Sequence, residues 1–183
     1  MQRRNFLTRI STLVAGLAGT AATTHIHAQA GTKAAPVAPP TEIDVTPIKA
    51  DKIVKLTLSD DEWKKRLSPA AYKVLRKEGT EPAGSSALNA EKRKGTFVCA
   101  GCDLPVFTSE MKYESGTGWP SFFDTIPAAL NTSTDYKLIY PRTEYHCARC
   151  GGHHGHVFKD GPKPTGKRWC NNGVSLKFVA AKV

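Results

Sequence analysis

The chain has 183 residues, which is enough for one small domain with extensions. Hydrophobic residues make up 40% of it and charged residues 23%, as is typical of a soluble globular protein. The formal net charge is +10, or +7 without the first thirty residues, which hold three arginines and no acid. Because the remaining basic residues are scattered rather than clustered, we expect no nucleic-acid partner.

Residues 1–30 predict an export signal. A twin-arginine pair, Arg3 and Arg4, precedes an apolar run over 10–22, and an Ala-Gln-Ala cleavage site follows at 28–30. A transmembrane anchor is the alternative, but glycines and threonines interrupt the run, which is shorter than the roughly 20 apolar residues of a span. We therefore expect a mature protein without a stable membrane span, exported to the periplasm by the twin-arginine route.

Residues 31–57 predict a flexible tether, because four prolines lie among alanines and threonines. Order is expected to begin near Leu58. Ser59 and Glu62 have the spacing of a capping box, in which a hydroxyl and a carboxylate satisfy the free N–H groups at the start of a helix.

A second helix is expected after Ser68, the N-cap, with Pro69 in its first turn and Gly79 as its stop. Beyond Gly95 the segments are short, rich in β formers and separated by glycine and proline. The expected strands are 96–99, 106–108, 136–140, 143–146, 156–158 and 174–179. The sequence therefore predicts two short N-terminal helices followed by a mainly β, antiparallel domain over residues 58–180.

Two C-x-x-C pairs, Cys99/Cys102 and Cys147/Cys150, are separated by 44 residues. Two such turns facing each other give the tetrahedral thiolate site that structural zinc prefers. The alternative is two disulfides formed after export. We favour zinc, because a twin-arginine substrate folds before export and a small β domain needs a staple. With four sulfurs bound, such an ion has no open position for catalysis.

The fifth cysteine, Cys170, is then left over, as an inert core thiol, an intermolecular bridge or a reactive group. Arg168 lies two residues before it, on the same face if this segment is a strand, and would stabilise a thiolate. Asn171 and Asn172 follow with amide donors. These neighbours favour the reactive thiol.

Three imidazoles lie close together at His153, His154 and His156. They could be one core histidine and two solvated ones, or proton donors to a reacting oxygen. A second metal site lacks a nearby carboxylate or thiol in the sequence. Trp119 lies among glycines in a turn-rich loop, which suggests an aromatic ring displayed at a pocket.

From Leu58 to Phe178 the sequence closely resembles the B-type methionine-R-sulfoxide reductases. The resemblance rests on both C-x-x-C pairs and on four further motifs, GTE (79–81), SGTGWPSF (115–122), GHVFKDGPKPTGKRWCNN (155–172) and SLKF (175–178). It implies a fold of two small antiparallel sheets with N-terminal helices, stapled by zinc on four cysteines.

The resemblance also implies roles for individual residues. Cys170 matches the nucleophile, Arg168 the arginine that supports its thiolate, and Asn172 the active-site asparagine. The reaction implied is attack of the Cys170 thiolate on a sulfoxide sulfur, which releases methionine and leaves a sulfenic acid. The expected substrates are oxidised proteins or peptides that carry methionine sulfoxide.

The remaining matched residues surround the substrate. His153 and His156 match the histidines that bind and protonate the sulfoxide oxygen. Trp119 matches the aromatic wall that receives the S-methyl group, and Phe158 is a further pocket residue.

Three positions depart from the family pattern. Trp169 replaces tyrosine or phenylalanine, His154 replaces leucine, and Thr117 stands where many members place a resolving cysteine. The last departure implies that an external, thioredoxin-like thiol reduces the sulfenic acid. The rival interpretations are a non-catalytic zinc-stapled binding module on the same scaffold, and a different thiol enzyme, such as a peroxide-reducing one.

Overall fold

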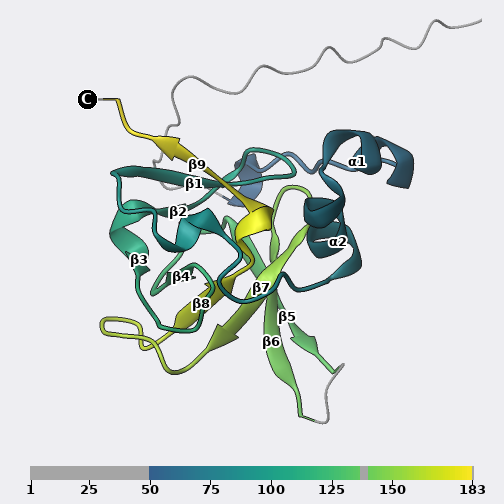
Figure 1. Cartoon of the computed structure of the whole chain (residues 1–183). Helices are drawn as coiled ribbons and strands as arrows, with labels where there is room; N and C mark the ends of the chain where they lie inside the picture. Colours follow the sequence, from purple (N-terminus) through teal and green to yellow (C-terminus); the bar gives the residue numbers. More distant parts are fainter. Residues whose placement is uncertain (1–49, 137–139, 183) are drawn as a thin grey trace, which may run out of the picture. The chain divides into compact units, whose positions relative to one another are not determined.

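A computed structural model of the chain describes residues 50–136 and 140–182 (Figure 1). The expected export signal and residues 31–49 of the expected tether lie outside the described residues. Within the described segments, no helix is long and apolar enough to cross a membrane.

Both predicted helices are present. Helix α1 (Asp60–Arg66) begins at Ser59, and the capping box is complete, since the Glu62 Oε2 atom accepts a 2.8 Å hydrogen bond from the Ser59 N–H. Helix α2 (Pro69–Lys77) begins at Ser68, whose hydroxyl accepts from the Ala71 N–H.

Helix α2 ends just before Gly79, as the sequence predicts, but the left-handed residue is its neighbour. Glu78, not Gly79, adopts the left-handed conformation at its C-terminus, with φ of 52°. The Gly79 N–H then closes the turn on the Lys73 carbonyl at 3.0 Å.

The ordered domain also begins before Leu58. A 3-10 turn, η1 (Ala50–Lys52), precedes it, and both Ile53 and Leu56 pack against the core. The Leu56 N–H donates to the Arg149 carbonyl at 2.9 Å. The last part of the expected tether is therefore fixed, because its apolar side chains cover the core and its backbone binds the loop after strand β6 (Arg142–Cys147).

The strands form two antiparallel sheets, as the resemblance implied (Figure 1). The smaller sheet has the order β2-β1-β9, made of Pro105–Thr108, Gly95–Cys99 and Leu176–Ala180. The larger has the order β3-β4-β8-β7-β6-β5, made of Lys112–Tyr113, Ser121–Phe122, Arg168–Asn171, His153–Phe158, Arg142–Cys147 and Leu130–Asp135. Three further 3-10 turns are η2 (Ala87–Asn89), η3 (Ser109–Met111) and η4 (Gly173–Ser175).

Tyr136 and Tyr140, the two ends of the predicted strand over 136–140, lie outside any strand. Strand β5 precedes this segment and ends at Asp135, Tyr136 is 77% exposed, and 137–139 lie outside the described residues. The strand that does form, LNTSTD, is mostly polar and exposed. It is a strand because it pairs with β6, from Leu130 opposite Cys147 to Asp135 opposite Arg142. No local pattern of apolar residues predicts this pairing.

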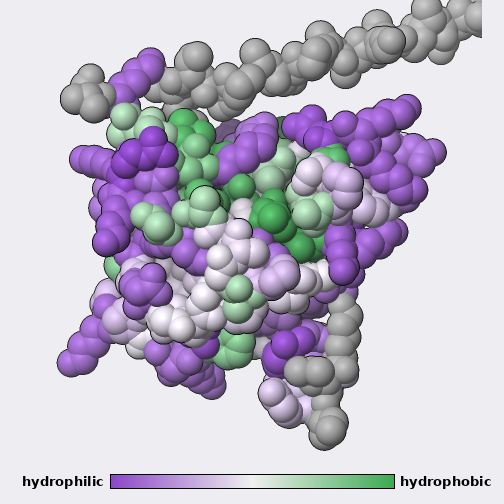
Figure 2. Space-filling model, in the orientation of Figure 1, coloured by the Kyte–Doolittle hydropathy of each residue, from purple (hydrophilic) through white to green (hydrophobic). Residues whose placement is uncertain are grey.

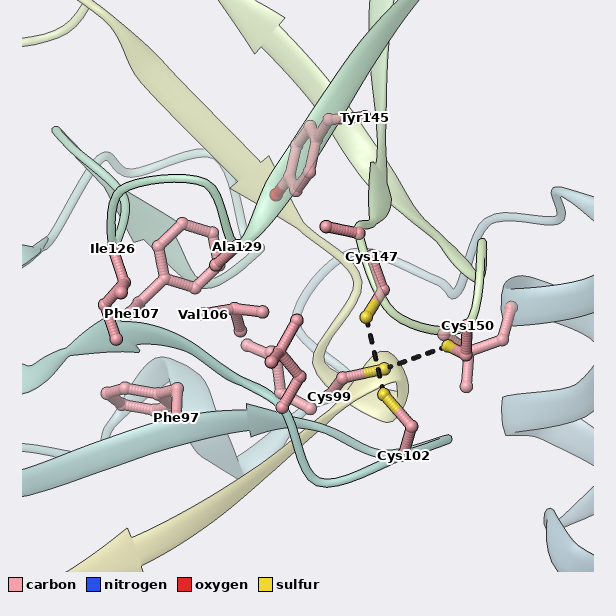
Figure 3. Packing of buried hydrophobic residues seen from close by; sticks show 14 of the residues in the cluster. Phe97, Cys99, Cys102, Val106, Phe107, Ile126, Ala129, Tyr145, Cys147 and Cys150 are labelled. Carbon is pink, nitrogen blue, oxygen red and sulfur yellow. Dashed lines mark hydrogen bonds between the residues drawn. The ribbon is translucent and has the colours of Figure 1, made fainter. Parts of the chain in front are cut away.

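The core contains an aromatic stack that includes residues of both sheets. The Phe107 and Phe122 rings are parallel, with centroids 4.0 Å apart, and Phe97 meets Phe122 edge-on at 4.9 Å. Tyr145 of β6 completes this cluster and lies near the cysteines (Figure 3). The face shown in Figure 2 is largely hydrophilic, with apolar residues exposed in smaller areas.

Candidate active site and metal centre

The four paired cysteines converge at one end of the core. Cys99 ends β1 and Cys147 ends β6, and the turn after each strand carries the second cysteine of its pair, Cys102 and Cys150. The Asp103 N–H bonds back to the Cys99 carbonyl and the Gly151 N–H to that of Cys147, each at 2.9 Å. These turns bring all four buried sulfurs together (Figure 3).

The sulfur distances fit a shared metal ion rather than disulfides. The Cys99 and Cys150 sulfurs are 3.6 Å apart and those of Cys102 and Cys147 are 3.4 Å apart. A disulfide needs about 2.05 Å, whereas four thiolates at about 2.3 Å from a tetrahedral zinc are separated by about 3.8 Å. All four thiols are free. The donor set therefore fits the structural zinc expected from the sequence.

The second centre lies on one face of the larger sheet. Side chains alternate along a strand, so Arg168 and Cys170 of β8 project from the same face. On the neighbouring strand β7, His156 lies directly opposite Cys170 and Phe158 directly opposite Arg168. Four of the residues named by the resemblance thus share one patch.

An irregularity in the ladder brings a further histidine to this face. The register of β6 and β7 shifts between Tyr145 and His146, so that His153 pairs with His146 while Gly155 pairs with Tyr145. The extra residue places the His153 ring 5.5 Å from the His156 ring, centroid to centroid. A regular strand would have put these two side chains on opposite faces.

A pocket of about 130 Å³ opens over this patch. Cys170, His156, Trp119, Phe158 and Asn172 all line it, together with Thr80, Arg142, Gly155 and Asn171. His153 lies behind this lining and is only 2% exposed. The pocket thus combines one thiol, one imidazole and two aromatic rings.

The Trp119 ring is held by Glu81, for which the sequence predicted no role of its own. Its Nε1–H donates to the Glu81 carbonyl at 3.1 Å. The buried Glu81 carboxylate accepts from the backbone N–H groups of Gly173 at 2.5 Å and Val174 at 3.0 Å. Glu81 therefore ties the tryptophan loop to the turn after β8. The GTE motif was its only sequence signal.

Both ends of the Asn172 carboxamide bind the backbone. Its Oδ1 accepts from the Glu81 N–H at 3.0 Å, and its Nδ2 donates to the His154 carbonyl at 2.9 Å. These bonds fix the loop after β8 against β7. In this geometry Asn172 positions the pocket wall rather than offering a donor to the thiol.

The Arg168 guanidinium interacts with a carboxylate, an aromatic ring and the Cys170 thiol. It makes two bonds to the Asp160 carboxylate, at 2.9 and 2.8 Å, and its guanidinium lies 4.3 Å from the Phe158 ring centroid. Burial raises the pKa of the Cys170 thiol above its ordinary value. The charge of Arg168 and hydrogen bonds from Thr117 and Arg168 act in the opposite direction without cancelling that effect.

The two histidines have carboxylate partners that the sequence reading missed. His156 Nε2 is 2.8 Å from Asp135 Oδ2, which also binds Arg142 at 2.6 Å. His153 Nδ1 is 3.3 Å from Glu144 Oε2. The expectation that no carboxylate lies near the histidines is therefore wrong, because β5 and β6 supply acids distant in sequence.

His153 and His154 differ in their surroundings. Burial, followed by the nearby His146 and His156, lowers the pKa of His153 to about 3, so that its ring is neutral at pH 7. His154 is fully buried on the core side, where Nδ1 lies 3.2 Å from Asn171 Oδ1 and 3.1 Å from Ser175 Oγ. His154 is therefore a core residue and takes no place in the pocket.

Fold and site together define a small domain of two β-sheets, with a thiol in a pocket and a separate cluster of four cysteines that could hold a metal ion. A family model described as the SelR domain matches residues 67–180. Relatives named peptide methionine sulfoxide reductase MsrB include one from Leptospira interrogans, 50% identical over 121 residues, and one from Methanosarcina barkeri, 51% identical over 121 residues. Each alignment covers 66% of this chain, and 92% and 85% of the respective relative.

A third relative, the mouse protein named methionine-R-sulfoxide reductase B3, mitochondrial, is 41% identical over 152 residues, which is 82% of this chain and 60% of the relative. The chain therefore belongs to the methionine-R-sulfoxide reductase B family. The enzyme class predicted from the sequence, peptide-methionine (R)-S-oxide reductase, is thereby confirmed.

Proposed function

We propose that this protein reduces the R epimer of methionine sulfoxide in proteins, with Cys170 as the nucleophile. The observation that carries the proposal is the pairing of Cys170 with His156 across β8 and β7, in a pocket that both line with Trp119 and Phe158. The two aromatic rings supply an apolar surface for the S-methyl group. The imidazole lies beside the thiol, where the sulfoxide oxygen would be.

The Cys170 thiolate attacks the sulfoxide sulfur while a proton is transferred to the oxygen. The oxygen ends on the cysteine, so that methionine sulfoxide and the thiol become methionine and Cys170 sulfenic acid. His156 is the better placed proton donor, since it lines the pocket and is held by Asp135. His153 is neutral and buried behind it, and supports the ring of His156.

The sulfenic acid then needs two electrons from outside the domain. The other four cysteines are buried together in one cluster, and the residue of the loop before β4 that lowers the pKa of Cys170 is Thr117, not a thiol. An external dithiol of the thioredoxin type attacks Cys170, releases water and leaves as a disulfide. The four cysteines hold zinc, which supplies a structural crosslink when bound.

We further propose that residues 1–30 direct twin-arginine export, so that the domain of residues 58–180 acts on oxidised proteins in the periplasm. The support is the twin-arginine pair, the apolar run and the Ala-Gln-Ala site in the sequence. Fusion of residues 1–30 to a reporter, with Arg3 and Arg4 both changed to Lys as the control, tests this. A reporter that stays in the cytoplasm in both cases would refute the proposal.

The activity is tested with peptides that carry either sulfoxide epimer. We expect turnover of the R epimer alone, loss of turnover in Cys170→Ser, and unchanged zinc content in that variant. Equal consumption of both epimers would contradict the assignment. A protein that binds zinc but reduces neither epimer would favour the non-catalytic binding module instead.

A further inference from the structure

A second group of metal-binding side chains lies on the same sheet face, beyond the pocket. Glu144 and His146 are two residues apart on β6 and so share a face, and His153 lies opposite His146 on β7. One ligand atom from each residue lies within 4.8 Å of the other two. Glu144 Oε2 is 3.3 Å from His153 Nδ1 and 3.9 Å from His146 Nε2.

We propose that Glu144, His146 and His153 form a binding site for a divalent transition-metal ion such as Zn²⁺, separate from the four-cysteine centre. Two imidazole nitrogens and one carboxylate oxygen suit zinc and its neighbours in the first transition row. Zinc binds these atoms at about 2.0–2.2 Å, which places ligand atoms about 3.0–3.6 Å apart. The separation of Glu144 Oε2 from His153 Nδ1 already lies in that range, and its separation from His146 Nε2 exceeds the range by a few tenths of an ångström.

Two of the ligand atoms are buried and lack a partner among the described residues. Glu144 Oε2 and His153 Nδ1 are each inaccessible and without a hydrogen bond there, although they lie 3.3 Å apart. A bound cation would satisfy both atoms, because a neutral imidazole and a carboxylate are the metal-binding forms.

Ser133 of β5 supports this arrangement from the outside. Its hydroxyl donates to Glu144 Oε1 at 3.1 Å and lies 3.5 Å from His146 Nδ1. The hydroxyl thus engages the outer atom of each side chain, which turns Glu144 Oε2 and His146 Nε2 toward each other. Such outer contacts are typical of metal ligands.

The adjoining group of Asp135, Glu144 and His156 is a weaker candidate. Asp135 Oδ2 already binds Arg142 at 2.6 Å and His156 at 2.8 Å. A cation there would have to displace the guanidinium charge. The site is therefore assigned to the group that contains His146.

The test measures bound zinc rather than activity, so that its failure is distinguishable from failure of the proposed function. Full-length protein that carries its first zinc is equilibrated with ZnCl₂ at neutral pH, and metal per chain is measured by mass spectrometry and titration calorimetry. We expect one additional zinc per chain. His146→Gln should weaken it by at least about tenfold, while Thr143→Ala, an exposed change on the same strand, should leave it unchanged.

Two further variants make the result decisive. Cys170→Ser should retain the additional zinc, and Ser133→Ala should weaken it while the first zinc stays bound. The proposal would be overturned if no second zinc binds, or if the wild type and His146→Gln bind the second zinc with equal affinity. Loss of the second zinc in Cys170→Ser alone would also overturn it. If His146→Gln also loses the first zinc, Ser133→Ala decides the matter. An unchanged affinity of Ser133→Ala for the second zinc would then overturn the proposal.

Discussion

Thr117 lowers the pKa of the Cys170 thiol, and Ser121 lies opposite Cys170 in the ladder of β4 and β8, so the loop before β4 lies beside the proposed nucleophile. The Thr117 hydroxyl is 2.9 Å from Ser115 Oγ, which in turn is 2.7 Å from Ser121 Oγ. A chain of hydroxyls thus stands where a second thiol would complete an internal disulfide. This arrangement makes the identity of residue 117 decisive for how the oxidised enzyme is recycled.

Thr117→Cys should convert the enzyme from external to internal resolution. One turnover without reductant should leave the wild type with a trappable Cys170 sulfenic acid and one methionine per chain. The variant should instead form a disulfide between Cys170 and the introduced thiol, because hydroxyl contacts through Ser115 link residue 117 to Ser121, which lies opposite Cys170. Mass spectrometry distinguishes the products, and Thr117→Ser should behave as the wild type. An internal disulfide in the wild type, with zinc released, would show that a metal ligand is the resolver.

Removal of His156 should slow the reaction without altering the fold. His156→Gln keeps a polar side chain but cannot donate the proton, so kcat should fall by roughly a hundredfold or more. Zinc content and the unfolding temperature are the controls. An unchanged kcat would show that another group donates the proton.

The pH profile should reflect the raised pKa of Cys170. The thiolate is the reactive form, and burial raises this pKa above the ordinary value of 9.0, so kcat/KM should still be rising at pH 9. Arg168→Gln removes a charge that lowers the pKa, so at pH 8 it should be slower than the wild type, with a profile shifted to higher pH. A profile that levels off near neutral pH in the wild type would contradict this account.

His153 should make the domain less stable in acid. Its pKa is lowered to about 3 in the folded protein, against 6.5 for an ordinary histidine, so the unfolded chain binds more protons between these values. The free energy of unfolding should therefore fall as pH drops from 6.5 toward 3. His153→Gln should show a smaller fall over that window in chemical denaturation, measured beside the wild type. Equal slopes would exclude this contribution.

Loss of one zinc ligand should unfold the domain. Cys102→Ser should strip the metal, and zinc ligation in small domains contributes on the order of 10 kcal/mol, comparable to the stability of a whole domain. Cys170→Ser is the matched control and should keep both metal and fold. Metal analysis with circular dichroism checks both variants, and a folded, metal-free Cys102→Ser protein would contradict a structural role.

Features that depend on short spacing along the chain could be predicted from the sequence alone. The capping box at Ser59, the N-cap at Ser68 and the two C-x-x-C turns are local, since the interacting groups lie within a few residues of each other. The left-over Cys170 and its neighbour Arg168 also followed from the sequence, since two residues along a strand share a face. The resemblance to the family then predicted the enzyme class and the residues of the pocket.

The carboxylates that meet the histidines could not be predicted from the sequence, because they lie on other strands. Asp135 and Glu144 approach His156 and His153 because β5, β6 and β7 lie side by side, and the bulge opposite Tyr145 turns His153 to the pocket side. The same bulge leaves His154 in the core, although the three histidines look equivalent in the sequence. Strand β5 itself was missed, because its polar residues form a strand only through their ladder with β6. Such pairings and burial depend on long-range register, which no local spacing in the chain specifies.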